Sequence, residues 1–174
     1  SLLRDPAMTR AIVFTRTKRG ADRVALQLNA EKFSATAMHG NLGQNARQRA
    51  LEDFRAGRVR VLVATDLAAR GIDVLGVSHV INYELPNEPE SYVHRIGRTA
   101  RNGAKGLAVA FCDATELTYL NAIEKLTGVK MDVASGTRPA HAQPAKKPQR
   151  HPDMIVRKPK RPQYGEKRQF SRAA

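Results

Sequence analysis

The regular alternation of short apolar runs with longer segments of helical period constrains the fold of this chain most. Five runs have the length of strands, namely AIVFT (11–15), ATAM (35–38), VRVLVA (59–64), HVINY (79–83) and LAVAF (107–111). Strands that are apolar at nearly every position are typical of parallel sheets with helices on both faces. The sequence therefore predicts an α/β domain of three layers, with a central parallel sheet flanked by helices.

Apolar residues repeat every three or four positions in three other segments, which predicts amphipathic helices. The stripes are Ala21, Val24, Ala25 and Leu28; Ala46, Ala50, Leu51 and Phe54; and Leu117, Leu120, Ile123 and Leu126. Gly57 stands just past the second helix, where a left-handed cap is needed, and Gly128 ends the third. Ligands of open parallel sheets bind beyond the carboxyl ends of the strands, so the turns after Thr15, Ala64 and Tyr83 are the places to search.

The composition changes near Asp132 and divides the chain into a domain, residues 1–132, and a tail, residues 133–174. The tail has eleven Lys and Arg against two acids, which gives it +9 of the total charge of +14, and it holds six of the nine prolines. Such a segment buries too little apolar surface to offset its ordering entropy, so we expect it to be disordered when unbound. Clustered cations are often only a solvated surface, but we favour polyanion binding, because neutralised phosphates release counterions.

Cys112 lies in an apolar run and has no second cysteine to pair with, so it is predicted to be a small core residue rather than a nucleophile. A reducing compartment fits this prediction. No segment has the length of a membrane span, and no apolar signal segment opens the chain. We therefore expect a cytoplasmic protein with no membrane partner.

The segment YVHRIGRTARNG (92–103) is the most informative for chemistry. Arg95, Arg98 and Arg101 recur every three residues, which on a helix points their guanidinium groups to roughly one side. A salt-bridged solvated face is the ordinary explanation of such a row, but no acid lies within the segment. We favour an anion site, because the planar, always-charged guanidinium matches phosphate oxygens. His94 heads this cluster.

A second cluster follows the run 59–64. Thr65 and Asp66 stand where a strand gives way to a helix, which is an N-cap arrangement that leaves backbone N–H groups available to a phosphate; capping alone is an equal explanation. Arg70 and Gly71 combine a charge with a backbone that allows close approach, and Asp73 is able to accept hydrogen bonds from sugar hydroxyls. Gln44 and Arg47 lie one turn apart on another helix, after His39 and Gly40, and are weak signals alone.

Taken together, these motifs resemble the C-terminal domain of DEAD-box RNA helicases. The matching segments are AIVFTRT (11–17), HGN (39–41) with Gln44-x-x-Arg47, VLVATDLAARGIDV (61–74), VINYELP (80–86) and HRIGRTAR (94–101), in the order and at the spacing of the family. The resemblance covers about residues 3–130 and implies a RecA-like fold. Within the family, FTRTKRGADRV and SYVHRIGRTAR are most similar to bacterial RhlE-type members.

The resemblance implies a role for each matched residue. Arg98 and Arg101 take the place of the arginine fingers at the γ-phosphate, where a guanidinium is worth a rate factor of roughly 10³ to 10⁵. Asp73 takes the place of the aspartate near the ATP ribose. Contacts to the RNA backbone are implied for Arg47, Thr65, Arg70 and Gly71, and contacts to the first RecA-like domain for His94 and Arg95. Gln44 is expected only to orient its neighbour.

The chain departs from the family pattern at two positions, neither of which changes the assignment, and it lacks several motifs of the complete enzymes. Ala100 replaces the commoner glycine, and alanine is tolerated where φ is negative. Glu84 replaces the usual aspartate and keeps the charge, and we expect it to change a contact at the domain interface. The chain has no phosphate-binding G-x-x-x-x-G-K-[ST] loop, no Asp-Glu-Ala-Asp box and no upstream glutamine motif. We therefore expect a fragment of a longer enzyme, with ATP and Mg²⁺ held mainly by an N-terminal domain and no metal ligands in this chain.

Three functions remain open from the sequence. The first is the C-terminal half of an ATP-dependent RNA helicase, which remodels RNA locally and hydrolyses no ATP alone. The second is an RNA-binding or protein-docking module that acts through the tail, on RNA or on a protein of RNA decay or ribosome assembly; Met154–Val156 are a candidate docking motif, and Tyr164 and Phe170 are candidates for base stacking. The third is a DNA helicase of the same superfamily.

Overall fold

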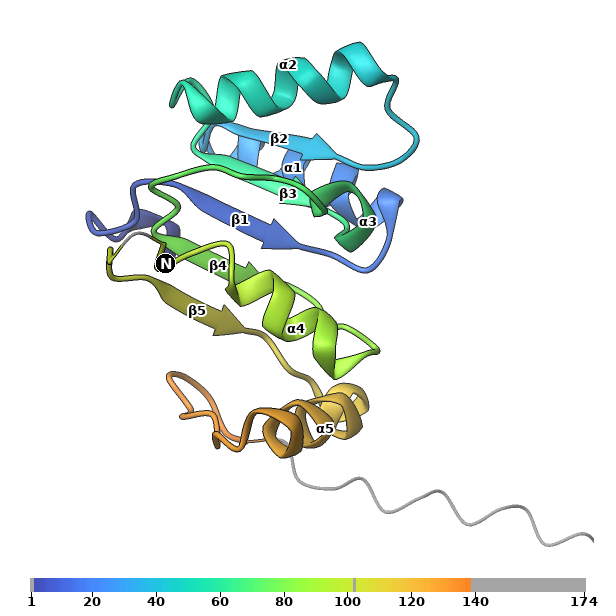
Figure 1. Cartoon of the computed structure of the whole chain (residues 1–174), viewed down its shortest axis with the longest axis vertical. Coiled ribbons are helices and arrows are strands. Elements are labelled where there is room, and N and C mark those ends of the chain that lie inside the picture. The colour runs from blue at the N-terminus through green and yellow to red at the C-terminus, as the bar shows by residue number, and fades with distance from the viewer. Residues whose placement is uncertain (1, 102, 139–174) are drawn as a thin grey trace, which may run out of the picture. The chain divides into compact units, whose positions relative to one another are not determined.

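The computed structural model describes residues 2–101 and 103–138, which belong to one compact unit (Figure 1). Within these ranges no helix combines the length and the apolar character that a membrane crossing requires. The predictions of a disordered tail, of a docking motif at Met154–Val156 and of base stacking by Tyr164 and Phe170 fall almost wholly on residues 139–174, which lie outside the described ranges.

Five parallel strands form the sheet, in the order β2-β3-β1-β4-β5. Their bounds are Ala11–Phe14 (β1), Ala35–Met38 (β2), Val61–Ala64 (β3), His79–Asn82 (β4) and Leu107–Ala110 (β5). Each strand lies within one of the apolar runs, so the predicted parallel sheet is confirmed. Phe14 is in register with both Ala64 and Asn82, so the carboxyl ends of the three central strands meet at one edge.

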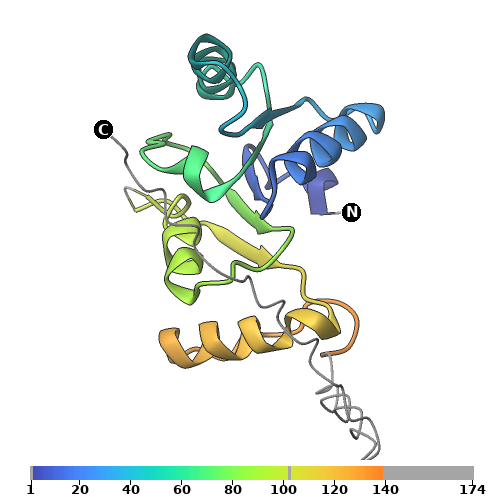
Figure 2. The same cartoon turned by 90° about the vertical axis from the view of Figure 1, so that its right-hand side faces the viewer.

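Helices cover the two faces of the sheet, as the three-layer prediction requires. The bounds are Lys18–Ala30 (α1), Gln44–Arg55 (α2), Asp66–Ala69 (α3), Pro89–Ile96 (α4) and Leu117–Thr127 (α5), with short 3-10 turns at Leu2–Arg4 (η1) and Ala114–Glu116 (η2). Helix α1 lies on one side of the sheet, and α3 and α4 lie on the other (Figure 2).

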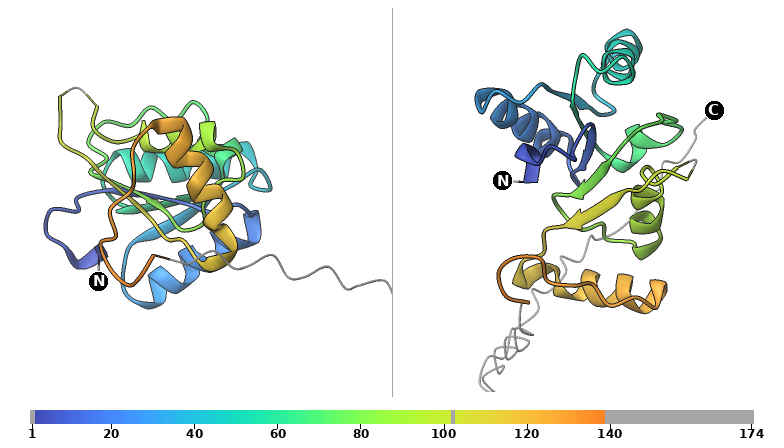
Figure 3. Two further views of the ribbon diagram at one scale, coloured as in Figure 1. Left: turned by 90° about the horizontal axis from the view of Figure 1, so that it is seen from below. Right: turned by 90° about the vertical axis from the view of Figure 1, so that its left-hand side faces the viewer.

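The pleat of β1 explains how one strand serves both faces. Ala11 and Val13 pack with the α1 stripe in one core cluster, whereas Ile12 and Phe14 pack with residues of α2 and α3 in the other. A third cluster joins α5 to α4, with Tyr92 and Leu85 against the α5 stripe. Helix α5 lies beyond the edge strand β5 and next to α4 (Figure 3).

Two residues of the predicted stripes are exposed. Ala46 is exposed and the side chain of Leu126 is 47% exposed. Each stands in a terminal turn of its helix, beyond the reach of the layer that covers the middle of the stripe. The predicted left-handed cap is confirmed, because Gly57 has a φ of 76° and donates its N–H to the carbonyl of Phe54.

Candidate functional site

A pocket of about 200 Å³ opens at the carboxyl edge of the sheet, between α3 and α4. Its lining residues are Phe14, Asp66, Ala69, Arg70, Ser91, His94, Arg95 and Arg98. Four predicted site residues therefore meet in one place, although Arg70 and the α4 cluster are more than twenty positions apart in the sequence. The turn after Ala64 is confirmed as a place where a pocket forms.

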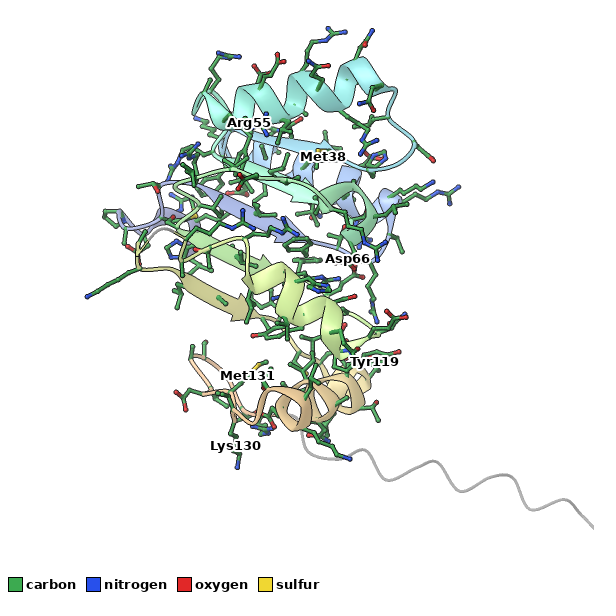
Figure 4. The ribbon with its side chains drawn as sticks, in the orientation of Figure 1. Met38, Arg55, Asp66, Tyr119, Lys130 and Met131 are labelled. Atoms are coloured by element: carbon green, nitrogen blue, oxygen red, sulfur yellow. The ribbon has the colours of Figure 1, made fainter. Side chains whose placement is uncertain are left out.

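Arg95 is the structural centre of this pocket, and its side chain is only 1% exposed. Its Nε and Nη2 donate to the two carboxylate oxygens of Asp66, at 2.6 and 2.8 Å, and its Nη1 donates to Asn82 Oδ1 at 3.0 Å and to the carbonyl of Glu84 at 2.7 Å. The guanidinium also lies over the ring of Phe14, 5.0 Å from the centroid. Asp66 sits beside α4 in Figure 4.

This geometry corrects the prediction that the three arginines point to one side. Arg95 lies within α4 and points into the interior. Helix α4 ends at Ile96, and Arg98 and Arg101 follow in the turn beyond it. The acidic partner that segment 92–103 lacks comes instead from Asp66 on another element. Arg95 therefore faces inward and is bonded within its own domain, whereas His94 is exposed and lines the pocket.

Arg98, Arg101 and Asp73 form a second group next to the pocket. Arg98 Nη1 donates to the carbonyl of Ile72 at 2.7 Å, and Arg101 Nη1 pairs with Asp73 Oδ1 at 2.5 Å. Partial burial and the neighbouring Arg101 lower the pKa of Arg98, and Asp73 opposes this shift. The two predicted finger arginines and the predicted ribose-binding aspartate thus lie within one electrostatic environment.

The predicted RNA-contact residues lie on two neighbouring elements. Thr65 caps α3 without a side-chain capping bond, and its own N–H donates to the carbonyl of Met38. Arg70 is exposed, and Gly71 has a φ of 77° with open space where a Cβ would stand. On α2, Arg47 Nη1 donates to Gln44 Oε1 at 3.4 Å, which is a weak bond.

His39 is a buried structural histidine, since its Nε2 pairs with Asp22 Oδ1 at 2.7 Å and its Nδ1 accepts from the N–H of Asn41. Gly40 follows it in the same turn. The pair positions the loop before α2 and contributes no group to either pocket lining.

Ala100 corrects a second expectation. The residue has a φ of 55°, in the left-handed region, whereas the substitution of glycine by alanine is well tolerated only at negative φ. Its neighbour Thr99 is buried and donates to the carbonyl of Val77, which ties the turn down on one side. Backbone strain is therefore present between Arg98 and Arg101.

A second pocket, of about 450 Å³, lies at the turns after β1, β4 and β5 and is lined by Arg16, Tyr83, Glu84, Phe111, Cys112, Asp113 and Glu116. Its carboxylates already have partners: Arg16 pairs with Glu116 at 3.1 Å, and its backbone N–H donates to Glu84 Oε2 at 2.7 Å. Burial raises the pKa of the Cys112 thiol, as expected of a partly buried cysteine that is no thiolate. The carboxylate of Glu84 is thus held within the domain.

Sequence reasoning missed Asn82 and Ser91. Asn82 is fully buried and bonds Arg95, and Ser91 lines the first pocket. A carboxamide inside the run HVINY was the available signal for Asn82, because a buried polar group requires a partner. Within residues 2–101 and 103–138, no group of three or more His, Cys, Asp or Glu is placed to hold a metal.

Comparisons with known proteins bear on the family and the fold. The model of the family described as helicase conserved C-terminal domain matches residues 2–103. Curated relatives include the DEAD-box ATP-dependent RNA helicase CshA of Bacillus subtilis (strain 168), which is 52% identical over 122 residues, or 70% of this chain and 25% of that protein. The chain therefore spans about a quarter of the length of the curated relatives it matches.

Two solved structures have the same fold. The E. coli DEAD-box protein SrmB, bound to regulator of ribonuclease activity A (RraA), matches with a TM-score of 0.69 and 41% identity over 72% of this chain and 74% of that chain. S. cerevisiae Dbp5, bound to RNA and ADP BeF3, matches with a TM-score of 0.65 and 41% identity over 70% of this chain and 33% of that chain.

Proposed function

This chain belongs to the family of helicase conserved C-terminal domains, in its DEAD-box group, and on that premise we propose that it is the C-terminal RecA-like half of an ATP-dependent RNA helicase. In this proposal residues 1–132 form the domain and residues 133–174 form a basic tail. ATP and Mg²⁺ are held mainly by a first RecA-like domain, and the two domains close on ATP and RNA. The RhlE-type assignment stays a prediction.

The observation that carries the proposal is the group of Arg98, Arg101 and Asp73. Phosphoryl transfer builds negative charge on the transferred oxygens, and a guanidinium placed there stabilises that charge. Two such groups stand here beside a carboxylate that is 76% exposed and able to bind sugar hydroxyls. We assign Arg98 and Arg101 to the γ-phosphate and Asp73 to the ribose.

The remaining assignments follow the pocket. His94 is the exposed group that meets the first domain, and Arg95 acts from inside by holding α4 to Asp66. Arg47, Thr65, Arg70 and Gly71 contact the RNA backbone, with Gly71 allowing close approach. Because these contacts go to phosphates and sugars, the helicase selects no particular RNA sequence.

A second function is favoured by the charge of the tail alone. Its +9 over residues 133–174 fits an RNA tether or a docking segment for another protein, such as one of RNA decay or ribosome assembly. SrmB, one of the structural neighbours, was solved with a protein partner. Under this alternative the tail binds RNA with an affinity that falls steeply with salt, or binds protein, whether or not the arginine group acts in catalysis.

The deciding experiment measures RNA-stimulated ATP hydrolysis by the full-length protein that contains this chain, as wild type, Arg98→Ala and Arg58→Ala. Arg58 is an exposed arginine paired with Asp53 ahead of β3, at the opposite edge of the sheet, so its loss controls for removal of a charge. We expect Arg98→Ala to lose turnover by about 100-fold or more with RNA binding kept, and Arg58→Ala to match wild type. Full turnover in Arg98→Ala refutes the proposal, as does ATP hydrolysis by this chain alone.

A further inference from the structure

Asn82 ends strand β4 and occupies an unusual place for a carboxamide. It is 0% exposed, and its register partner on the central strand is Phe14. Both side chains point to the face of the sheet that carries α3 and α4, since the two residues before them, Val80 and Ile12, belong to the core cluster on that face. Asn82 is therefore a polar group built into the floor beneath the arginine pocket.

The hydrogen bonds of Asn82 fix its orientation. A guanidinium only donates, so the side-chain oxygen of Asn82 must face Arg95, and it accepts from Nη1 at 3.0 Å. The amide nitrogen Nδ2 then points the other way, where it is buried and has no hydrogen-bond partner among the described residues. Rotating the amide by 180° would place a donor against a donor and lose the bond to Arg95.

An unpartnered buried donor normally destabilises a fold, so its presence needs an explanation. The oxygen of the same side chain supplies that explanation. It completes the set of acceptors around the buried guanidinium, in which Asp66 takes Nε and Nη2, while Asn82 and the carbonyl of Glu84 share Nη1. Without Asn82, Nη1 would keep only the carbonyl of Glu84 as an acceptor, so the guanidinium would be held less firmly on that side of the Asp66 pair.

Arg95 joins three elements that surround the arginine pocket. It stands on α4, which presents His94; it binds Asp66 at the start of α3, just before Arg70; and it reaches β4 through Asn82. Arg98 lies two residues past Ile96, the last residue of α4. The position of the reactive arginine relative to the pocket therefore depends on the orientation of Arg95.

We propose that Asn82 is a positioning residue of the ATPase reaction: through its hydrogen bond to Arg95 it holds α4, and with it Arg98, in the geometry required for catalysis. This inference rests on the proposed function. Asn82 touches neither of the predicted ligands, so its effect falls on turnover rather than on binding.

The test compares three variants of the full-length protein. Asn82→Asp keeps an oxygen that accepts from Arg95, whether the new carboxyl is ionised or protonated. Asn82→Leu has a similar volume and no acceptor. Val80→Ala is the matched control, because Val80 is fully buried on the same strand and the same face but contacts no member of the Arg95 network through a polar atom. Its kcat should equal that of wild type well below its Tm.

We expect Asn82→Leu to lower kcat by about 10- to 100-fold with KM for ATP and RNA changed less than about threefold, and Asn82→Asp to stay within about threefold of wild type. In this chain alone, the Arg95 Nε–H resonance should exchange with solvent faster in Asn82→Leu than in wild type or Asn82→Asp. A packing role predicts the opposite order, with leucine at least as active as aspartate.

The outcomes separate this inference from the proposed function. If Asn82→Leu keeps the kcat of wild type, Asn82 has no positioning role. The same conclusion holds if Val80→Ala and Asn82→Leu lose kcat in the same proportion to their loss of Tm. If Arg98→Ala in the same assay keeps full turnover, the proposed function fails and takes the inference with it. Loss of turnover in Arg98→Ala together with the order aspartate above leucine at position 82 supports both.

Discussion

Replacing Ala100 by glycine should stabilise the domain, although glycine usually destabilises. The φ of 55° places the backbone of Ala100 in the left-handed region, where the crowding of Cβ against the following carbonyl oxygen costs a non-glycine residue roughly 1–2 kcal/mol. Glycine removes that strain, but it also raises the conformational entropy of the unfolded chain, which destabilises the fold by about 0.5–1 kcal/mol. The difference is a net stabilisation of about 0.5–1 kcal/mol, which for a domain of this size corresponds to a rise in Tm of about 2–4 °C.

The measurement is thermal unfolding of this chain by calorimetry, with two control variants. Lys32 is the other described non-glycine residue with positive φ, at 64°, and lies in the turn after α1, so Lys32→Gly should raise Tm by a similar amount far from the arginine group. Ala56 has a φ of −74° at the end of α2, so Ala56→Gly relieves nothing and should lower Tm.

The sign of the effect decides the reasoning. If Ala100→Gly lowers Tm as Ala56→Gly does, the left-handed strain at Ala100 is absent or is offset by contacts of its methyl group. If Lys32→Gly stabilises and Ala100→Gly does not, the turn between Arg98 and Arg101 adopts a different backbone in solution. Either result refutes the strain at Ala100.

Three further predictions follow from the site and its surroundings. Gly106→Ala should destabilise the domain by about 1–3 kcal/mol, measured by urea unfolding, because a Cβ there would overlap Thr99 Oγ1 and the N–H of Ala100; no change in midpoint would mean that the turn moves freely. Asp73→Asn should leave Tm nearly unchanged, since an exposed ion pair contributes only about 0–1 kcal/mol, but should raise KM for ATP in the full-length protein; an unchanged KM removes Asp73 from the ribose site. Burial raises the pKa of Glu116, so protonation of this residue stabilises the folded state. The free energy of unfolding of wild type, relative to that of Glu116→Gln, should therefore fall as pH rises through the raised pKa. A difference in unfolding free energy that does not change with pH contradicts this.

The fold followed from the sequence because its signals are local. Runs such as 61–64 and 79–82 are apolar at nearly every position, which only a strand covered on both faces requires. Gly57 similarly predicted the residue with left-handed backbone conformation that follows α2. The errors at Ala46 and Leu126 arose because periodicity says which side of a helix is apolar but not how far the covering layer extends.

The candidate site was predictable only as a set of residue types. The motifs placed Arg70, His94 and Arg98 near one another, and one pocket contains them. The inward turn of Arg95 was not predictable, because it depends on Asp66, 29 positions away, and on the end of α4 at Ile96. The backbone of Ala100 was hidden for a related reason: a φ angle is set by the turn as a whole, not by the residue that occupies it.

Under the proposed function, the ion pair between Arg101 and Asp73 lies where the nucleotide binds. In the resting chain each of these groups neutralises the other, so the edge presents less free charge than its composition suggests. In that proposal, a nucleotide that offers a sugar hydroxyl to Asp73 and a phosphate to Arg101 replaces both partners together, and because the carboxylate of Asp73 is 76% exposed the exchange needs little energy. Under the proposal, a free phosphate ion replaces only the partner of Arg101 and leaves Asp73 unpaired, so the pair favours a ligand long enough to reach both groups.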